Sequence, residues 1–374
     1  MLSYHVYAVT DSYAALGLLG LTEFLPVIPV SLVAGPLADR FDRRIQILLA
    51  YGASAILSGV LAFQIRGDPT DVPWVFGLAF VLAIASGFAL PPAKALLPSL
   101  VPHEIFQNAS VVSASFTHAA WVAGPILMGF LIEPFGFAAP YAVAAGFYAL
   151  SVVSIAGVPA SPVHGERAEL SVAAVREGLE FVWRAKALFG SQALDMFAVI
   201  FASATALLPV YAEEILRVGP EGYGMLRGSI AVGTFAMTFA LMAARPFTRP
   251  GLVLLWAVAT FGVATLVFGL SRSYPLSIAA FMVAGMADQV SMTVRSVILQ
   301  MSTPDALRGR VNAVSLIFIG ASNELGDAES GFFASLTSAT FAVVAGAGLC
   351  LGVTAATAAG LPELRNWQPP RKPA

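Results

Sequence analysis

Eleven long apolar runs constrain this chain more than any other feature of its sequence. Lipid offers no partner to an unpaired backbone N–H or C=O group, so only helices and closed barrels cross a membrane, and runs of about 20 residues have the length of a spanning helix. The sequence therefore predicts an all-α polytopic membrane protein with eleven complete spans. The runs lie at about residues 12–34, 45–64, 73–92, 105–132, 138–158, 188–212, 222–244, 251–271, 274–301, 311–333 and 338–361.

The composition excludes several classes of protein. With 58% hydrophobic and 11% charged residues, the chain has too few polar side chains to cover a soluble globule of 374 residues. Nothing in its charge supports a nucleic-acid partner. The single cysteine, Cys350, permits no intramolecular disulfide and no cysteine cluster for a metal. No Walker loop, zinc-binding histidine pair or nucleophile elbow occurs, so we expect no enzymatic activity, no cofactor and no bound metal.

Basic residues predict the orientation in the membrane. The stretch from Gly35 to Arg44 carries five charges between the first two runs. We expect it to form a tight cytoplasmic hairpin, because Lys and Arg accumulate in cytoplasmic loops. Every second connection is then cytoplasmic, which places fifteen basic residues inside and four outside. The four on the outer side are Arg66, Arg217, Arg227 and Arg272.

The chain divides into two halves around one long polar connection. We predict an N-terminal transmembrane half at 1–158, a cytoplasmic linker with an amphipathic helix at 159–187, and a C-terminal transmembrane half with a short cytoplasmic tail at 188–374. Residues 1–10 resemble the last turns of a first helix that is largely missing. The motif at 100–105 recurs at 302–307, an offset of 202 residues, which indicates two pseudo-repeats of six helices.

Carboxylates inside the apolar runs are the candidates for proton coupling or for lining a cavity. A charge at a helix centre costs about 2.5–3.5 kcal/mol on insertion scales, so it normally faces protein or water. Glu23 lies near mid-bilayer just before Pro26 and Pro29, which we expect to interrupt the helix; the alternative is a neutral structural carboxyl. The run at 311–333, which contains Glu324 and Asp327, could also end early and leave Glu329 and with it Asp327 in water. The candidates are Glu23, Asp195, Asp288, Glu324 and Asp327.

Three other polar side chains have simpler interpretations. Lys94 and Arg295 lie near the cytoplasmic ends of their runs, where we expect both to extend to the headgroups. Asp288 is two turns from Arg295, about 10 Å, so we expect it to find another partner or a proton. We interpret His118, beside Trp121, as a packing residue rather than a proton relay.

Several stretches resemble the major facilitator superfamily. Gly35 to Arg44 resembles its loop signature Gly-x-x-x-Asp-Arg-x-Gly-Arg-Arg between helices 2 and 3, with Asp42 at the second Gly, where a left-handed backbone is expected. Residues 120–129 resemble the helix-5 signature of its antiporters through Gly124, Pro125 and Gly129, although Gly and Pro are also common in any membrane helix. Residues 194–198, 303–311 and 318–326 resemble the multidrug and siderophore branch, which is enterobactin exporter-like.

The resemblance implies a proton-coupled exporter of a drug-like or siderophore-like small molecule in a bacterial inner membrane. Its partners would be that substrate, protons and the lipid bilayer. Asp39 is expected to contact the start of the span near Val311 when the transporter is open to the outside. An uptake symporter or facilitator and a non-transporting scaffold are the alternatives, and mid-bilayer carboxylates argue against the scaffold. The implied gating residues are Gly35, Asp39, Arg40, Arg43, Arg44, Arg308 and Arg310.

Overall fold

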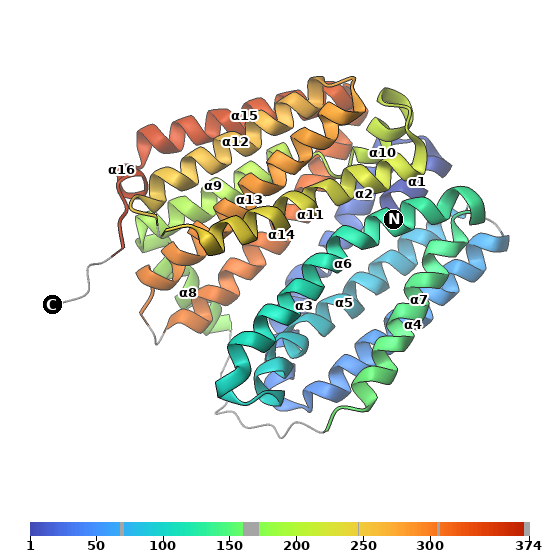
Figure 1. Cartoon of the computed structure of the whole chain (residues 1–374), viewed down its shortest axis with the longest axis horizontal. Helices are drawn as coiled ribbons and strands as arrows, with labels where there is room; N and C mark the ends of the chain where they lie inside the picture. The colour runs from blue at the N-terminus through green and yellow to red at the C-terminus, as the bar shows by residue number, and fades with distance from the viewer. Residues whose placement is uncertain (68–70, 160–171, 246, 305–306, 370–374) are drawn as a thin grey trace.

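The computed structural model describes residues 1–67, 71–159, 172–245, 247–304 and 307–369, and every regular element within these ranges is helical (Figure 1). The N-terminal group comprises α1 (Leu2–Thr10), α2 (Tyr13–Phe24), α3 (Val27–Arg40), α4 (Arg43–Gly67), α5 (Val72–Leu100), η1 (His103–Ile105), α6 (Phe106–Phe135) and α7 (Ala138–Ala156). After α8 (Val172–Arg184), the C-terminal group comprises α9 (Lys186–Ala202), α10 (Leu208–Val210), η2 (Tyr211–Ile215), α11 (Gly219–Ala243), α12 (Pro250–Leu270), α13 (Tyr274–Ser302), α14 (Arg308–Leu336), α15 (Ala339–Gly360) and α16 (Pro362–Arg365).

All eleven predicted apolar runs coincide with helical structure. Within the described residues, eight helices are long and apolar enough to cross a membrane alone, namely α4, α5, α6, α7, α11, α12, α13 and α15. The run at 12–34 is divided between α2 and α3, and the run at 188–212 is divided between α9 and α10 with η2. The remaining run forms α14, which stays helical through its carboxylates to Leu336, so the expectation that it could end early is wrong.

The helix bounds repeat the sequence offset. When the bounds of α5, Val72 and Leu100, are moved by 202 residues, they coincide with those of α13, Tyr274 and Ser302. The next helices, α6 and α14, begin at positions 106 and 308, which have the same separation. The two pseudo-repeats expected from one short motif therefore extend to whole helices.

The stretch from Gly35 to Arg44 is mostly helical rather than an open loop. Helix α3 continues through Arg40, and only Phe41 and Asp42 separate it from α4. Asp42 does not take the left-handed backbone that the motif suggests, because its side chain accepts a hydrogen bond from the backbone N–H of Arg44 at 2.9 Å and so caps α4. This cap explains why Asp can occupy the position of a motif Gly.

Arg43 and Arg44 bind the inner ends of neighbouring helices. The guanidinium of Arg43 donates to the carbonyl oxygen of Ala95 in α5 at 3.2 Å, and that of Arg44 donates to the carbonyl oxygen of Ala156, the last residue of α7. The carbonyl of Ala156 is free because it ends α7, and free carbonyl groups at a helix C-terminus carry partial negative charge that favours cations. The two arginines therefore fasten α4 to the rest of the N-terminal group.

The two groups of helices are sealed together at their outer ends. In α2 and α14, a Cβ atom on Gly17 would lie 2.8 Å from the backbone nitrogen of Phe332, and one on Gly20 would lie 2.7 Å from that of Ala328. In α6 and α11, a Cβ atom on Gly224 would lie 2.6 Å from the carbonyl oxygen of Pro125. Such close backbone approach between membrane helices requires small residues.

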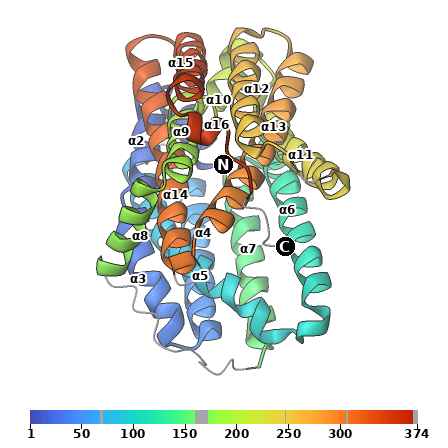
Figure 2. The ribbon, with the colours of Figure 1, turned by 90° about the vertical axis from the view of Figure 1, so that its left-hand side faces the viewer.

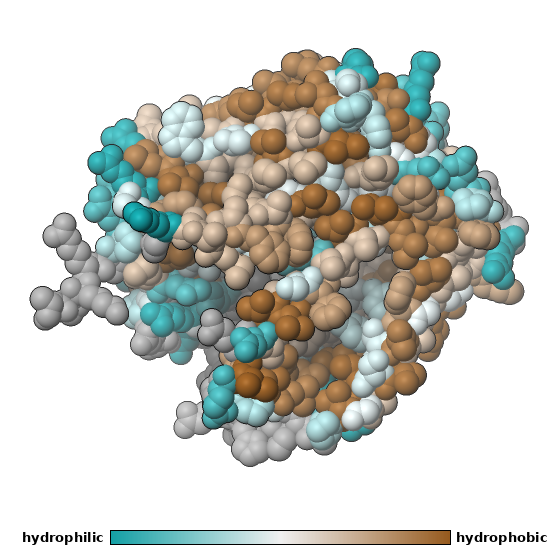
Figure 3. Space-filling view, viewed as in Figure 1, coloured by the Kyte–Doolittle hydropathy of each residue, from teal (hydrophilic) through white to brown (hydrophobic). Residues whose placement is uncertain are grey.

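The inner ends of the two groups are separated. Among the described residues, α5 and α6 have no extensive packing against α13 or α14. The surface is hollowed between the two groups at the end where α8 lies (Figure 3). Apolar side chains cover the middle of this face, and hydrophilic side chains gather towards its two ends. The chain is therefore closed at the end that the basic residues predict to be the outer one and open at the end predicted to be cytoplasmic.

Helix α8 lies across the inner end of the C-terminal group (Figure 2). It meets α9 at an angle of 103°. Val182 is buried whereas Trp183 is exposed, as expected for an amphipathic helix, although part of the predicted linker, 160–171, lies outside the described residues. A Cβ atom on Gly178 would lie 2.9 Å from the carbonyl oxygen of Arg310, so α8 packs directly on the start of α14.

Candidate functional site

Glu23 occupies the last turn before a break in its helix. Helix α2 ends at Phe24 and α3 begins at Val27, so Leu25 and Pro26 form the break that the prolines predict. Glu23 lies ten residues after Tyr13, the outer start of α2, and a rise of 1.5 Å per residue places it about 15 Å into the membrane. The hydrocarbon core is about 30 Å thick, so Glu23 is near its middle.

Four charged residues converge at this depth between the two groups of helices. We call Glu23, Arg227, Glu324 and Asp327 the central cluster. Arg227 interacts electrostatically with all three carboxylates, and Glu324 also interacts with Glu23 and Asp327. Arg227 is eight residues from the outer start of α11, and Asp327 is nine from the outer end of α14, about 12 and 14 Å at the helical rise. Three of the five predicted carboxylates are thus brought together.

Arg227 is the member of the cluster that sequence reasoning missed. The charge pattern predicts an outer position for it, but it lies two turns inside α11 and points into the interface, one turn after the buried Tyr223. Its Nη1 atom is buried and has no hydrogen-bond partner among the described residues. The signal in the sequence was its position five residues into an apolar run, which is too deep for a loop.

Asp327 is held by the break in another helix. Its Oδ1 atom accepts hydrogen bonds from the hydroxyls of Ser203 at 2.7 Å and Thr205 at 2.6 Å. Both residues lie in the unwound stretch between α9 and α10, and Ser330 donates to the carbonyl oxygen of Ser203 at 2.7 Å. Interrupted helices that aim polar groups at the membrane midplane are typical of binding sites in secondary transporters.

Asp195 and Arg295 form a second charged centre, inside the C-terminal group. Arg295 Nη1 lies 2.7 Å from Asp195 Oδ2, and their side chains are only 7% and 8% exposed. The expectation that Arg295 extends to the headgroups is wrong, because its guanidinium is buried against the carboxylate of Asp195 on α9. Asp288 interacts electrostatically with Arg295. Lys94, by contrast, is exposed, as expected for a side chain that extends to water.

The antiporter-like stretch of α6 contributes to the outer seal. A Cβ atom on Gly129 would lie 2.6 Å from the carbonyl oxygen of Pro220, and the carbonyl oxygen of Pro125 touches Gly224. Gly124 faces open space. His118 packs against the rings of Trp121 and Phe235, with centroid distances of 5.8 and 5.9 Å, in agreement with a packing role.

The implied gating residues are spread over both groups. Gly35 is half-buried within α3, and the side chains of Asp39 and Arg40 lie outside the described part of the chain. Arg310 forms an ion pair with Glu177 of α8. Arg308 is exposed at the start of α14.

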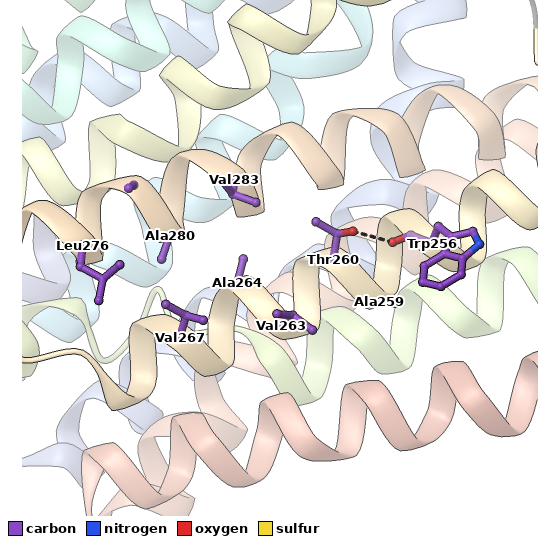
Figure 4. Close-up of a pocket in the computed structure, with 10 residues that line it drawn as sticks. Trp256, Ala259, Thr260, Val263, Ala264, Val267, Leu276, Ala280 and Val283 are labelled. Carbon is purple, nitrogen blue, oxygen red and sulfur yellow. Dashed lines mark hydrogen bonds between the residues drawn. The ribbon is translucent and has the colours of Figure 1, made fainter.

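An apolar cavity of about 380 Å³ lies apart from these charges, between residues of α12 and α13 (Figure 4). Its walls include Trp256, Val263, Val267 and Leu276, and the only hydroxyl, Thr260, donates to the carbonyl oxygen of Trp256. The cavity contains no ionisable side chain. It therefore offers no group for proton coupling.

Comparison with known families identifies this arrangement. Residues 2–372 match the transmembrane secretion effector family of major facilitator proteins. The chain belongs to the major facilitator superfamily. The chain is 26% identical over 332 residues to the enterobactin exporter EntS of Escherichia coli O1:K1, covering 86% of this chain and 77% of that protein. It is also 26% identical over 354 residues to EntS of Citrobacter koseri, covering 91% and 82%.

Solved structures share the fold of this chain at low sequence identity. A POT family transporter in complex with 5-aminolevulinic acid superposes with a TM-score of 0.76 at 14% identity, over 97% of this chain and 92% of that one. A bacterial homologue of the human lysosomal transporter Spinster gives 0.71 at 14% identity over 99% and 96%. The xylose transporter XylE from E. coli gives 0.68 at 15% identity over 95% and 92%.

Proposed function

We propose that this protein is a proton-coupled exporter of a drug-like or siderophore-like small molecule in a bacterial inner membrane. The direction of transport is supported by the bacterial relatives named as enterobactin exporters. The close packing of Pro125 and Gly129 on α11 supports an antiporter-like role for α6. Proton coupling is supported by the central cluster.

The observation that carries the proposal is the excess of carboxylates in the central cluster. Glu23, Glu324 and Asp327 face one guanidinium, that of Arg227, at mid-membrane depth. If all four were ionised, the cluster would hold two uncompensated negative charges in a medium where each is costly. Binding of protons, or of a cationic group of the substrate, removes that cost. The cluster is therefore suited to exchange one for the other.

The members of the cluster have different roles in this scheme. Asp327 already accepts two hydroxyl hydrogen bonds, so it remains the anionic partner of Arg227. Glu23 and Glu324 bear the exchangeable protons. Because Glu23 belongs to α2 and Glu324 to α14, movement of the two groups changes their separation and hence the free energy of ionising both.

Alternating access follows from motion of the two halves. In this proposal, residues 1–158 and 188–374 rock about the central cluster, and the inner ends close when the outer seal opens. Asp39 then meets the start of α14 near Arg308 and Arg310. In the inward-open form Glu177 engages Arg310, so Glu177 and Asp39 compete for one guanidinium.

Everted membrane vesicles energised by respiration test the proposal. Addition of a transported probe should release protons from the lumen, and Glu23→Gln should abolish this release while leaving probe binding intact, because the amide cannot exchange a proton. Suitable probes are the cationic dye ethidium and an iron-free catecholate siderophore. Glu329→Gln is the matched control, since Glu329 lies on α14 outside the cluster.

The alternatives predict other outcomes. An uptake symporter would accumulate the probe in right-side-out cells and not in everted vesicles. A facilitator would equilibrate the probe without moving protons. Unchanged coupling in Glu23→Gln would contradict the assignment of Glu23 and transfer the exchange to Glu324 or to Asp195 and Asp288.

A further inference from the structure

A group of tyrosines and glutamates joins the two halves at the outer surface, and neither the sequence motifs nor the proposed function uses it. Tyr4 donates to Glu213, and Tyr7 donates to Glu214. Tyr13 also donates to Glu214, with distances of 3.1 and 2.9 Å to its two carboxylate oxygens. The tyrosines belong to α1 and α2, and both glutamates belong to η2, so every one of these bonds crosses from the N-terminal to the C-terminal group.

The local structure explains how two adjacent glutamates reach three tyrosines. Residues 211–215 form a single π-helical turn, which is wider than an α-helical turn and is frequently found at functional positions. Tyr4 and Tyr7 are three residues apart and therefore share one face of α1. The ring of Tyr7 stacks on that of Tyr13 at a centroid distance of 6.1 Å, which brings both hydroxyls to Glu214.

Helix α1 is anchored to the N-terminal group on its other side. Val6 is buried among Leu19, Leu61 and Leu78 of that group. The ring of His5 lies 3.3 Å from the hydroxyl of Tyr141 in α7. The tyrosines thus move with the N-terminal group, whereas the glutamates move with the C-terminal group.

The rings of Tyr4 and Tyr7 are buried, that of Tyr13 is half-buried, and their carboxylate partners are exposed. Tyr4 and Tyr7 are each 3% exposed, and Tyr4 packs on Tyr223 of α11 at a centroid distance of 4.9 Å. Glu213 and Glu214 are exposed. The two halves cannot part at this end while the hydroxyls remain bound, and water that enters would have to replace a set of charge-assisted hydrogen bonds.

We infer that Tyr4, Tyr7 and Tyr13 with Glu213 and Glu214 form the latch that holds the outer side of this transporter closed. The inference goes beyond the proposed function and uses only its premise that the two halves alternate. The latch sets the ratio of inward-open to outward-open molecules before any substrate or proton binds. Its loss should favour the outward-open form.

Cysteine labelling from outside measures that ratio directly. Ala334→Cys places a thiol in the outer seal, where Ala334 is 1% exposed, and the native Cys350 is fully buried. In Ala334→Cys, the additional changes Tyr4→Phe, Tyr7→Phe and Tyr13→Phe keep the rings but remove all three hydroxyls. We expect labelling by a membrane-impermeant maleimide to accelerate about tenfold, since a hydrogen bond to a charged group is worth at least that factor. Ser273→Cys, at an exposed position before the outer start of α13 and away from the tyrosines, should label at a constant rate.

Matched variants separate a latch from a general loss of packing. Tyr51→Phe is the control. The ring of Tyr51 contacts that of Tyr148 at a centroid distance of 5.9 Å, and both residues belong to the N-terminal group. It should leave labelling at the parent rate. If the triple variant fails to insert, Glu214→Gln should accelerate labelling on its own, because a neutral amide is a weaker acceptor.

Labelling at the parent rate in both the triple variant and Glu214→Gln would overturn the latch, as would equal acceleration by Tyr51→Phe. These readouts need neither substrate nor a proton gradient. Failure of proton-coupled export in vesicles, with accelerated labelling in the latch variants, would refute the proposed function and leave the latch intact.

Discussion

The buried pair Asp195–Arg295 leads to a quantitative prediction about stability. At a separation of about 4 Å and an effective dielectric constant of about 20, two unit charges attract by about 4 kcal/mol. Both side chains are more than nine-tenths buried, so little water is available to replace a lost partner. Removal of one member of a buried pair typically costs about 3–5 kcal/mol, because the other charge is left uncompensated.

The two single variants should differ in a defined order. Arg295→Met leaves Asp195 and Asp288 without their common cation, so it should lower the free energy of unfolding by about 3–5 kcal/mol. Asp195→Asn keeps an oxygen near the guanidinium and leaves Asp288 as a counter-charge, so its cost should be about 1–3 kcal/mol. The double variant Asp195→Leu with Arg295→Met removes both charges of the pair but still leaves Asp288 without its cation, so it should cost less than Arg295→Met alone without returning to the parent value.

Equilibrium unfolding in mixed micelles of mild detergent and dodecyl sulfate measures these differences. The single variant Asp195→Leu, with the parent, Arg295→Met and the double variant, completes a double-mutant cycle that gives the coupling energy between Asp195 and Arg295. If the double variant is as unstable as the two single variants added together, the pair makes no mutual contribution and the reasoning fails. A cost below about 0.5 kcal/mol for Arg295→Met would likewise refute it.

Four further predictions concern the helix ends and the seals. Asp42→Ala removes the cap of α4 and should cost about 0.5–2 kcal/mol of stability in the same unfolding assay, whereas Asp42→Asn should preserve it. Gly224→Ala inserts a methyl group at the seal with Pro125 and should destabilise the outer-closed form by about 1–3 kcal/mol, seen as faster outer labelling. Asp39→Asn should favour the inward-open form and raise cytoplasmic labelling of cavity positions; unchanged labelling and transport would exclude a latch at this loop. The Lys186 ammonium lies 2.9 Å from Glu363 and lowers the pKa of that carboxyl through a hydrogen bond. The ion pair should therefore hold α16 in place above the ordinary carboxyl pKa range and weaken as the pH falls through the lowered pKa. Fluorescence of Trp367 would report this change, and Glu363→Gln should eliminate the pH dependence.

The sequence predicts the spans well because one physical constraint, the absence of hydrogen-bond partners in lipid, acts on every residue of each run. It also predicts the break beside Glu23, because Pro26 and Pro29 act locally. The loop motif is less informative about backbone, since Asp42 can cap a helix where Gly would turn one. The offset of 202 is visible in a short motif and proves to describe complete helices.

The pairing of charges could not be predicted in the same way. Arg295 has Asp288 as its candidate partner along its own helix, but its actual partner, Asp195, is 100 residues away on α9. Arg227 is predicted on the outer side, because the asymmetry of basic residues depends on the side of the membrane and carries no information about depth. Both errors have one cause: periodicity assigns residues to a face of a helix, whereas the neighbour of that face depends on how the helices pack.

The unequal charges of the central cluster have an electrical consequence for the cycle. When Glu23, Glu324 and Asp327 are all ionised, the cluster of the proton-free carrier, Arg227 included, has a net charge of two negative units near the midplane. One unit charge that crosses a full 100 mV changes in energy by about 2.3 kcal/mol, so two charges that sense half of that voltage gain a similar amount. An inside-negative voltage repels such a carrier from the cytoplasmic side, whereas a carrier neutralised by two protons does not sense it. In the proposed exchange, voltage would therefore accelerate the outward step of the proton-free carrier loaded with a neutral substrate, and leave the inward return of the protonated carrier to the pH gradient.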